Sequence, residues 1–337
     1  MMLAIQITPP IAPNDLIPIE IAEPELRPGE VLVRLQAAAL NHRDLYLLQG
    51  GRTPAGQAFI IGSDGAGTVE AIGPGVREAG VGDQVLVYPA MRWGNKESAP
   101  GPGFEVLGGA DNGTFAQYIA LPLENVRRKP DHLSWEEAAA LPLSGITAYR
   151  ALIPRAGLQA GESVLIHGIG GAVALAALQI AVAKGARAIV TSSSDTKLER
   201  ARELGAAVTI NYAQTDWLKA VQEATEGEGA DVVLESVGQA TFAGSITAVK
   251  AGGRIVTFST TTGGTPTINI RELFWKQATI LGTTMGSPMD FTGLLELYRA
   301  HTLHPIIDRT YPLAEVGAAF TRLEAAEQFG KIVLTIP

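Results

Sequence analysis

The most constraining feature of the sequence is a regular alternation of short apolar segments with helix-like segments in its second half. Apolar, β-branched segments begin 20 to 25 residues apart, which is the length of one strand plus one crossover helix. They are 163–167, 187–192, 207–212, 231–237, 254–259 and 279–285. Their nearly continuous apolar character is typical of parallel strands that are covered on both faces. We therefore predict an α/β fold with a six-stranded, doubly wound sheet of the dinucleotide-binding type.

Length and composition set outer limits on the rest of the chain. The 337 residues are enough for about two domains, and 46% hydrophobic with 18% charged residues is a globular composition. A net charge of −8 argues against nucleic acid as the main partner, because phosphate binding needs surfaces rich in Lys and Arg. We see no secretory signal at the N-terminus, and the longest apolar stretch, 168–183, is short for a membrane span. We expect a cytoplasmic protein with no membrane partner.

The stretch before the alternation has a different character. Short β-rich segments such as 31–38, 67–72, 84–88 and 115–120 are separated by Gly/Pro turns, which predicts a mostly β domain. Ser134 and Glu137 have the spacing of a capping box that begins the helical region.

Beyond the six strands we predict a helix over 291–301 and a final strand over 331–334. The sheet already has its six strands, so the last strand should return to the first domain. We place one domain at 1–124 and 287–337, and the other at 125–286.

A glycine-rich turn follows the first of the six apolar segments. Gly168, Gly170 and Gly171 precede an Ala-rich helix that opens with Ala172 and Val173. Such a turn lets the backbone approach a pyrophosphate, which the N–H groups at the helix start then hold. The alternative is a strand-to-helix turn that binds nothing. The five further strand–helix alternations favour nucleotide binding, with Gly168 as a contact in the turn.

The end of the second segment bears on the choice of nicotinamide cofactor. An NAD site normally places Asp or Glu there, whereas this chain has Ser192, Ser193 and Ser194 with Lys197 close behind. Three hydroxyls and a cation suit a 2′-phosphate, so we expect NADP(H) rather than NAD(H). The alternative is that Ser194 caps the next helix and Lys197 is solvated.

Several motifs together resemble the medium-chain dehydrogenase/reductase superfamily. They are Asn41-x-x-Asp44-x-Tyr46, Gly62-x-Asp64-x-x-Gly67 with its continuation to Val76, 81–85, Leu141-Pro142-x-x-Gly145-x-Thr147-Ala148-Tyr149 and Gly330-Lys331. The resemblance covers essentially the whole chain. It implies a GroES-like, mostly β catalytic domain, closed by the C-terminal segment, together with a six-stranded Rossmann domain.

The chain departs from the zinc alcohol dehydrogenases of that superfamily. Where these place Cys, His, Glu and Cys around the metal, the matching positions here are Asn41, Ser63, Asp64 and Leu143. The stretch 91–111, which matches their structural zinc lobe, has neither Cys nor His, and the whole chain has no Cys. Zn²⁺ needs about four N, S or O ligands. We therefore expect no metal, and the chain resembles the zinc-independent quinone oxidoreductase (zeta-crystallin-like) branch.

Metal-free reduction favours particular substrates. Quinones and α,β-unsaturated carbonyl compounds spread the developing charge onto oxygen, so they need a Lewis acid less than simple ketones do. The candidate catalytic residues are Asn41, Tyr46 and Asp64. Tyr46 could donate a hydrogen bond to the substrate oxygen, and Asn41 could hold the substrate or the cofactor amide. The alternatives are that Asn41 and Asp44 brace a turn, that Tyr46 packs under the cofactor and that Asp64 is a structural acceptor.

The resemblance also implies cofactor contacts outside the glycine turn. His42, beside Asn41, is the histidine that could meet the pyrophosphate, while the other four histidines have no ligand spacing and are interpreted as structural. At the glycine turn itself the resemblance implies Gly171, Ala172 and Val173. The remaining cofactor candidates are Asp44, Thr147, Ser192, Ser193, Ser194, Lys197, Tyr212, Val237, Gly238, Phe258, Ser259 and Thr260.

Two other functions stay open on the sequence. One is an alcohol dehydrogenase-like enzyme that acts on simple alcohols or ketones. The other is an NADPH-binding protein with little turnover, like the crystallin or RNA-binding relatives. We also expect a homodimer, because 279–285 predicts an unprotected edge strand that can pair across a two-fold axis.

Overall fold

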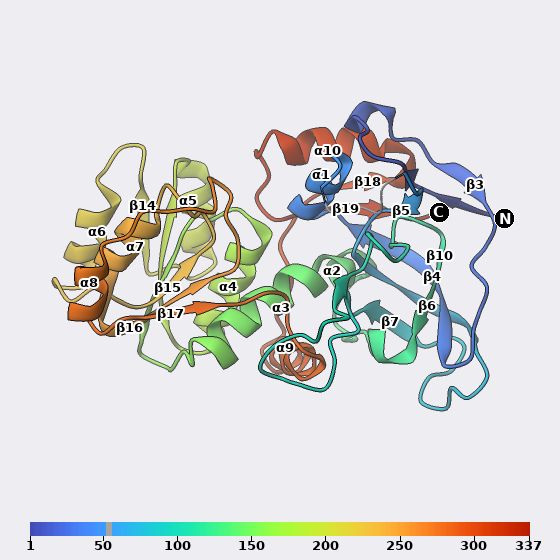
Figure 1. Cartoon of the computed structure of the whole chain (residues 1–337), viewed down its shortest axis with the longest axis horizontal. Helices are drawn as coiled ribbons and strands as arrows, with labels where there is room; N and C mark the ends of the chain where they lie inside the picture. The colour runs from blue at the N-terminus through green and yellow to red at the C-terminus, as the bar shows by residue number, and fades with distance from the viewer. Residues whose placement is uncertain (52–55) are drawn as a thin grey trace. The chain divides into compact units, whose positions relative to one another are not determined.

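A computed structural model describes residues 1–51 and 56–337 and divides into two compact units. Unit 1 comprises Met1–Leu143 and Ser287–Pro337, and unit 2 comprises Ser144–Gly286. One unit is thus inserted into the sequence of the other (Figure 1). Among the described residues, no helix has both the length and the apolar character needed to cross a bilayer.

Unit 1 is built on a seven-stranded sheet with the order β11-β7-β6-β4-β19-β18, and β10 pairs with β4 off this path. Its strands are β4 (Glu30–Ala39), β6 (Asp64–Ile72), β7 (Gln84–Val87), β10 (Tyr118–Pro122), β11 (Val126–Arg128), β18 (Ile307–Pro312) and β19 (Lys331–Thr335). Three small ribbons join it: β1 (Met2–Ala4) with β3 (Ile19–Ile21), β2 (Gln6–Ile7) with β5 (Phe59–Ile60), and β8 (Ala90–Met91) with β9 (Glu105–Val106).

The core of unit 1 follows from alternation along its central strand. In β4 the inward positions Val31, Val33 and Leu35 are buried, while Arg34 between them is exposed. The helices of unit 1 are α1 (His42–Leu48), α2 (Trp135–Ala140), α9 (Pro288–Ala300) and α10 (Val316–Glu324). Ser134 and Glu137 form the expected capping box at the start of α2. The mostly β first domain is confirmed, although α1 is a helix that the sequence analysis did not anticipate.

The C-terminal strand returns to unit 1 as predicted. In β19, Val333 pairs with Ala39 of β4 in antiparallel register, and the opposite edge of β19 pairs with β18 in parallel. Residues from the two ends of the sequence therefore share one sheet. This return brings Lys331, at the start of β19, next to the end of β4.

Unit 2 confirms the doubly wound parallel sheet. Its order is β14-β13-β12-β15-β16-β17, with every neighbouring pair parallel. The strands are β12 (Ser163–Ile166), β13 (Arg187–Ser192), β14 (Val208–Asn211), β15 (Ala230–Glu235), β16 (Val249–Thr257) and β17 (Thr279–Gly282). The helices are α3 (Pro142–Arg150), whose first two residues belong to unit 1, α4 (Ala172–Ala183), α5 (Asp195–Glu203), α6 (Trp217–Ala224), α7 (Phe242–Ala248) and α8 (Ile270–Trp275).

The first domain boundary differs from the sequence prediction. We predicted it between residues 124 and 125, whereas the division falls between Leu143 and Ser144. The physical reason is that β11 pairs with β7 and the Ala-rich face of α2 is buried against the sheet of unit 1. The second division, between Gly286 and Ser287, lies where the sequence analysis placed it.

Candidate active site

Two chain reversals bring Asn41 and Asp64 to the same corner of unit 1. Asp64 is the first residue of β6 and pairs with Ala39, near the end of β4. Asn41 follows two residues later as the N-cap of α1, and its backbone N–H donates to Asp44 Oδ2 at 2.7 Å. The turn from β4 into α1 thus holds Asn41 beside the Asp64 carboxylate.

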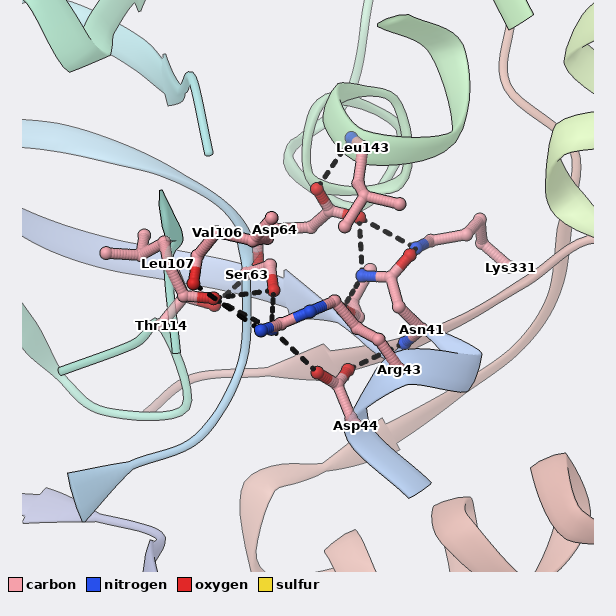
Figure 2. Close-up of polar contacts among 11 residues, drawn as sticks. Asn41, Arg43, Asp44, Ser63, Asp64, Val106, Leu107, Thr114, Leu143 and Lys331 are labelled. Carbon is pink, nitrogen blue, oxygen red and sulfur yellow. Dashed lines mark hydrogen bonds and ion pairs between the residues drawn. The ribbon is translucent and has the colours of Figure 1, made fainter. Parts of the chain in front are cut away.

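Lys331 completes a buried polar triad with these two residues. Its Nζ donates to Asp64 Oδ2 at 2.7 Å and to Asn41 Oδ1 at 2.8 Å, and Asn41 Nδ2 donates to Asp64 Oδ2 at 3.0 Å (Figure 2). Lys331 is 3% exposed and Asp64 has no exposed surface. A lysine is rarely buried unless it is paired, and here both of its partners are themselves fixed by the fold. The triad is therefore a built site rather than a surface ion pair.

The residues at the expected metal positions do not fit Zn²⁺. Both oxygens of Asp64 are occupied, because Oδ1 accepts the Leu143 backbone N–H at 2.8 Å and Oδ2 accepts from the other two triad members. Asn41 Oδ1 faces an ammonium group, and the Leu143 side chain has no atom that could ligate a metal. A divalent cation at these oxygens would lie against the Lys331 charge. Among the described residues, no three His, Asp or Glu side chains converge as a ligand set.

Arg43 engages Ser63, the remaining residue at those positions. Its Nη1 donates to Ser63 Oγ at 2.7 Å and to the Leu107 carbonyl at 2.9 Å, and Ser63 Oγ itself donates to that carbonyl. Ser63 is therefore committed to hydrogen bonds within the protein. Burial lowers the pKa of Arg43, and the neighbouring carboxylates Asp44 and Asp64 oppose the shift.

Asp44 braces α1 and has no surface to offer a cofactor. Its side chain is fully buried, with Oδ2 on the Asn41 N–H and Oδ1 3.7 Å from Arg43 Nη1. Burial raises the pKa of Asp44 to about 6, although Arg43 and the Asn41 N–H both lower it. The bracing role that the sequence left open for Asp44 is the one that its contacts support.

Tyr46 and His42, by contrast, are accessible on α1. Tyr46 is 56% exposed, and its ring lies over Gly51, where any Cβ would overlap it. His42 is exposed at the first position of the helix. Desolvation of its imidazole and, secondarily, the Lys331 ammonium lower the pKa of His42.

The 92–111 loop is held together by contacts among its own residues. Trp93 is 2% exposed and packs edge-on against Phe104 at 5.3 Å between ring centroids. Its Nε1–H donates to the Lys96 carbonyl at 2.9 Å, and Arg92 pairs with Asp111 at 2.7 Å. An aromatic pair and an ion pair therefore stabilise this segment. In zinc alcohol dehydrogenases, cysteine thiolates bound to a structural zinc ion are expected to do so.

In unit 2, the glycine turn has the geometry expected of a pyrophosphate site. Gly168 and Gly170 have φ of +68° and +120°, a region that side chains rarely adopt. Gly171 is the N-cap of α4 and provides no side-chain cap for the first N–H groups of the helix. A Cβ at Gly170 would lie 2.9 Å from Lys197 Cδ and 3.5 Å from its Nζ. The turn and Lys197, 27 residues apart in the sequence, are thus brought together.

The serines after β13 organise the start of α5. Ser194 Oγ accepts the Lys197 backbone N–H at 3.4 Å, and Ser192 Oγ accepts the Ser194 N–H at 3.2 Å. The capping role foreseen for Ser194 is therefore present. Asp195 is directed toward Asn211 and Gln214, at 2.6 and 2.9 Å, which lowers its pKa.

The remaining cofactor candidates lie in different surroundings. Tyr212 is 49% exposed after β14, and Phe258, Ser259 and Thr260 follow β16 directly. Thr147 is buried within α3. The backbone N–H groups of Val237 and Gly238 both donate to Glu235, so these two donors are not directed at a ligand. Whether these residues contact a cofactor stays a prediction.

Sequence reasoning missed three residues that organise these sites. Lys331 was noted as part of a motif but given no role, and Arg43 was passed over. Glu235 was read as part of a strand, although an acidic residue ending an otherwise apolar strand is a usable signal. Arg43 donates to Leu107, 64 residues away, and Lys331 donates to Asp64, 267 residues away, whereas the hydrogen-bond partners of Glu235 lie within ten residues of it.

Comparison with known families agrees with the fold of both units. Residues 27–131 match the alcohol dehydrogenase GroES-like domain, and residues 172–300 match the zinc-binding dehydrogenase domain. The chain belongs to the zinc-binding dehydrogenase family. This family is part of the medium-chain dehydrogenase/reductase superfamily, and the resemblance found in the sequence is confirmed at that level.

Similar proteins carry several different activities in their names. A zinc-type alcohol dehydrogenase-like protein of Schizosaccharomyces pombe is 36% identical over 332 residues, covering 96% of each chain. A quinone oxidoreductase of Pseudomonas aeruginosa is 33% identical (91% of each chain), and a crotonyl-CoA reductase of Streptomyces avermitilis is 31% identical (89% of this chain, 77% of the other). A crystal structure described as an NAD-dependent alcohol dehydrogenase has a TM-score of 0.94, with 37% identity and full coverage of both chains. The chain is therefore an oxidoreductase of this family.

Proposed function

We propose that the chain is a metal-independent, NADPH-dependent reductase of quinones or α,β-unsaturated carbonyl compounds. The observation that carries the proposal is the position of the Lys331 ammonium. It donates hydrogen bonds to the oxygens of Asp64 and Asn41, two of the residues at the family's metal positions. Conjugated acceptors distribute the negative charge left by hydride addition, so they can react without a Lewis acid. The names of the quinone oxidoreductase and crotonyl-CoA reductase relatives are consistent with such substrates.

The cofactor assignment is supported by unit 2. Bound NADPH would supply the hydride. The N-terminus of α4 and the glycine turn would hold its pyrophosphate, and Ser192, Ser194 and Lys197 would hold its 2′-phosphate. NADH is the second candidate, because the solved structure described as an alcohol dehydrogenase is called NAD-dependent.

We propose different roles for the three candidate catalytic residues. Tyr46 is exposed and carries the O–H donor proposed to polarise the substrate oxygen. Asn41 and Asp64 are engaged with Lys331 and with backbone groups, so we propose that they position the turn rather than touch the substrate.

Steady-state assays that follow NADPH consumption test the proposal. The substrates are quinones, 2-enals and saturated ketones of matched size. Each is assayed with untreated and with chelator-treated enzyme, and with either NADPH or NADH as the hydride donor. We expect turnover of the conjugated acceptors at least about tenfold above that of saturated ketones, unchanged by the chelator. Chelator-sensitive oxidation of simple alcohols would support the alcohol dehydrogenase alternative, and tight NADPH binding without turnover would support a binding protein.

A further inference from the structure

Glu235 is a buried carboxylate at the carboxyl end of β15 that the proposed reaction does not use. It has no exposed surface. Its Oε1 accepts the backbone N–H groups of Val237 at 2.8 Å and Gly238 at 3.0 Å, both from the loop after the strand. The Thr241 hydroxyl donates to the same carboxylate at 2.9 Å. One side chain thus anchors the 237–238 loop at both of its backbone N–H groups.

The opposite side of the carboxylate leads to the glycine turn. The Ser245 hydroxyl donates to Glu235 Oε2 at 2.6 Å, and His167 Nε2 lies 3.1 Å from Ser245 Oγ. His167 Nδ1 lies 3.4 Å from the Thr191 hydroxyl, which accepts the Gly168 N–H at 3.3 Å. His167 and Gly168 are consecutive residues at the start of the turn, so the network reaches the turn by two routes.

The direction of these hydrogen bonds starts from Ser245. Because its hydroxyl donates to Glu235 Oε2, its oxygen accepts from His167 Nε2–H. Burial lowers the pKa of His167, which favours the neutral imidazole, although Glu235 opposes the shift. In that neutral form, with the proton on Nε2, Nδ1 accepts from the Thr191 hydroxyl.

We propose that this relay, Thr191–His167–Ser245–Glu235, positions the glycine turn and the 237–238 loop together so that both are preorganised for the nicotinamide cofactor. The relay joins the carboxyl ends of β13, β12 and β15, which are neighbours in the sheet. Ligands of open parallel sheets bind at these ends, and loops that are already ordered bind with a smaller entropy loss. The inference rests on cofactor binding by unit 2, not on the choice of substrate. The four residues are positioning residues and need not touch the cofactor.

The test uses a matched pair of serine variants in the full-length chain. Ser245→Ala breaks the relay while leaving Glu235 its other donors. Ser163→Ala is the control, because Ser163 Oγ donates to Asp231 Oδ2 at 2.7 Å and joins the same two strands, β12 and β15, at their amino ends. We expect Ser245→Ala to raise the Kd for NADPH about tenfold, and the control to change it less than about twofold at a similar loss of Tm. Equal effects of the two variants on Kd would overturn the proposal.

A double-variant cycle tests whether the relay acts as one unit. Thr191→Val breaks it on the other side of His167, and we expect this variant alone to match Ser245→Ala. If the relay is one unit, the double variant should bind NADPH about tenfold weaker than wild type, not about a hundredfold weaker as two independent losses would give. Additive losses would contradict the proposal.

Nuclear magnetic resonance reports the tautomer of His167, which a loss of stability alone would not change. The ¹⁵N shifts of His167 should show protonated Nε2 and unprotonated Nδ1 in wild type, and a mixture of tautomers in Ser245→Ala. A wild-type chain that binds neither NADPH nor NADH would overturn the proposed function together with this inference. A wild-type chain that binds while Ser245→Ala binds equally well overturns the inference alone.

Discussion

Lys331 illustrates how one side chain can decide the chemistry of a site. Its ammonium lies within hydrogen-bond distance of both Asp64 and Asn41, and it is almost fully buried. An isolated charge would be very costly at such a position, but a carboxylate and an amide oxygen offset the loss of water. The outcome is an ion pair without net charge at the position where zinc-dependent members of the family are expected to hold a divalent cation.

The first residue-scale prediction concerns metal binding. Restoring donors with Asn41→Cys, Ser63→His and Leu143→Cys should not create a zinc site while Lys331 remains. Adding Lys331→Ala should raise zinc affinity by about a hundredfold or more, because the competing ammonium is gone. Equilibrium dialysis with elemental analysis measures both variants. Equal zinc affinity with and without Lys331 would show that the ammonium does not exclude the metal.

The second prediction concerns the buried carboxylate of Asp44. Its pKa is about 6 in the folded chain, against about 4 when unfolded, so the folded chain binds more protons between these values. Wild-type stability should therefore fall as pH rises through this window, by about 1 kcal/mol between about pH 5 and about pH 7.5. Asp44→Asn should lack this component. Urea unfolding of both chains at the two pH values measures it, and parallel profiles would contradict it.

The third prediction concerns Tyr46. Tyr46→Phe removes the hydroxyl and keeps the ring that covers Gly51, so folding should be unaffected. We expect kcat to fall about tenfold to a hundredfold with conjugated substrates, while the Kd for NADPH stays within about twofold. Tyr311→Phe is the control, since Tyr311 is a partly exposed tyrosine of β18 in the same unit and has no proposed role in the site. Unchanged turnover in Tyr46→Phe would show that Tyr46 contributes only packing and not a hydrogen bond to the substrate.

At the scale of elements, the turn after β12 and the start of α5 act together. The two segments are separate in sequence, yet the Lys197 side chain extends over Gly170, where any Cβ would crowd it. Ser194 fixes the first turn of α5, and α5 in turn carries Lys197. The position of the Lys197 ammonium therefore depends on both the glycine turn and α5.

This arrangement predicts how cofactor choice responds to substitution. Lys197→Ala should weaken NADPH binding about tenfold and leave NADH binding within about twofold, because only NADPH carries the 2′-phosphate. Arg200→Ala, one turn later on α5, is the matched control and should alter neither Kd by more than about twofold. Fluorescence titration with both cofactors measures the effect. Equal weakening of both cofactors by Lys197→Ala would place the lysine at the shared pyrophosphate instead.

At the scale of the whole molecule, one edge of unit 2 is poorly protected. Among the described strands, β17 is hydrogen-bonded to β16 alone, and the preceding helix α8 exposes Ile270, Phe274 and Trp275 by 59, 60 and 79%. An edge strand beside exposed aromatic side chains is a surface that a second copy can cover. We propose that the chain forms a homodimer through this edge.

The dimer proposal is tested by sedimentation velocity at micromolar concentrations. Trp275→Glu should raise the dimer dissociation constant at least about tenfold, because it places a charge within the apolar edge. Val81→Glu, at a similarly exposed apolar residue of unit 1, should leave it unchanged. A wild-type chain that sediments as a monomer would refute the proposal.

The local patterns predicted the elements well and their partners poorly. Strand–helix alternation gave all six strands of unit 2, and the capping box at Ser134 gave the start of α2, because both depend on neighbours within a few residues. The helix α1 was missed because its seven residues offer too few turns for a helical period. The domain boundary moved because pairing of β11 with β7 is not encoded in the local composition of 126–128.

The sequence by itself determined the fold class, the glycine turn and the loss of the family's metal ligands, since each is a matter of residue type at a given spacing. The tertiary structure alone decided what replaces those ligands. Lys331 meets Asp64 across 267 residues of sequence, because β19 returns to β4. The relay from Gly168 to Glu235 likewise depends on parallel strands that lie side by side. Charge pairing and hydrogen bonding act through space at about 3 Å, and only the folded chain specifies which distant groups come that close.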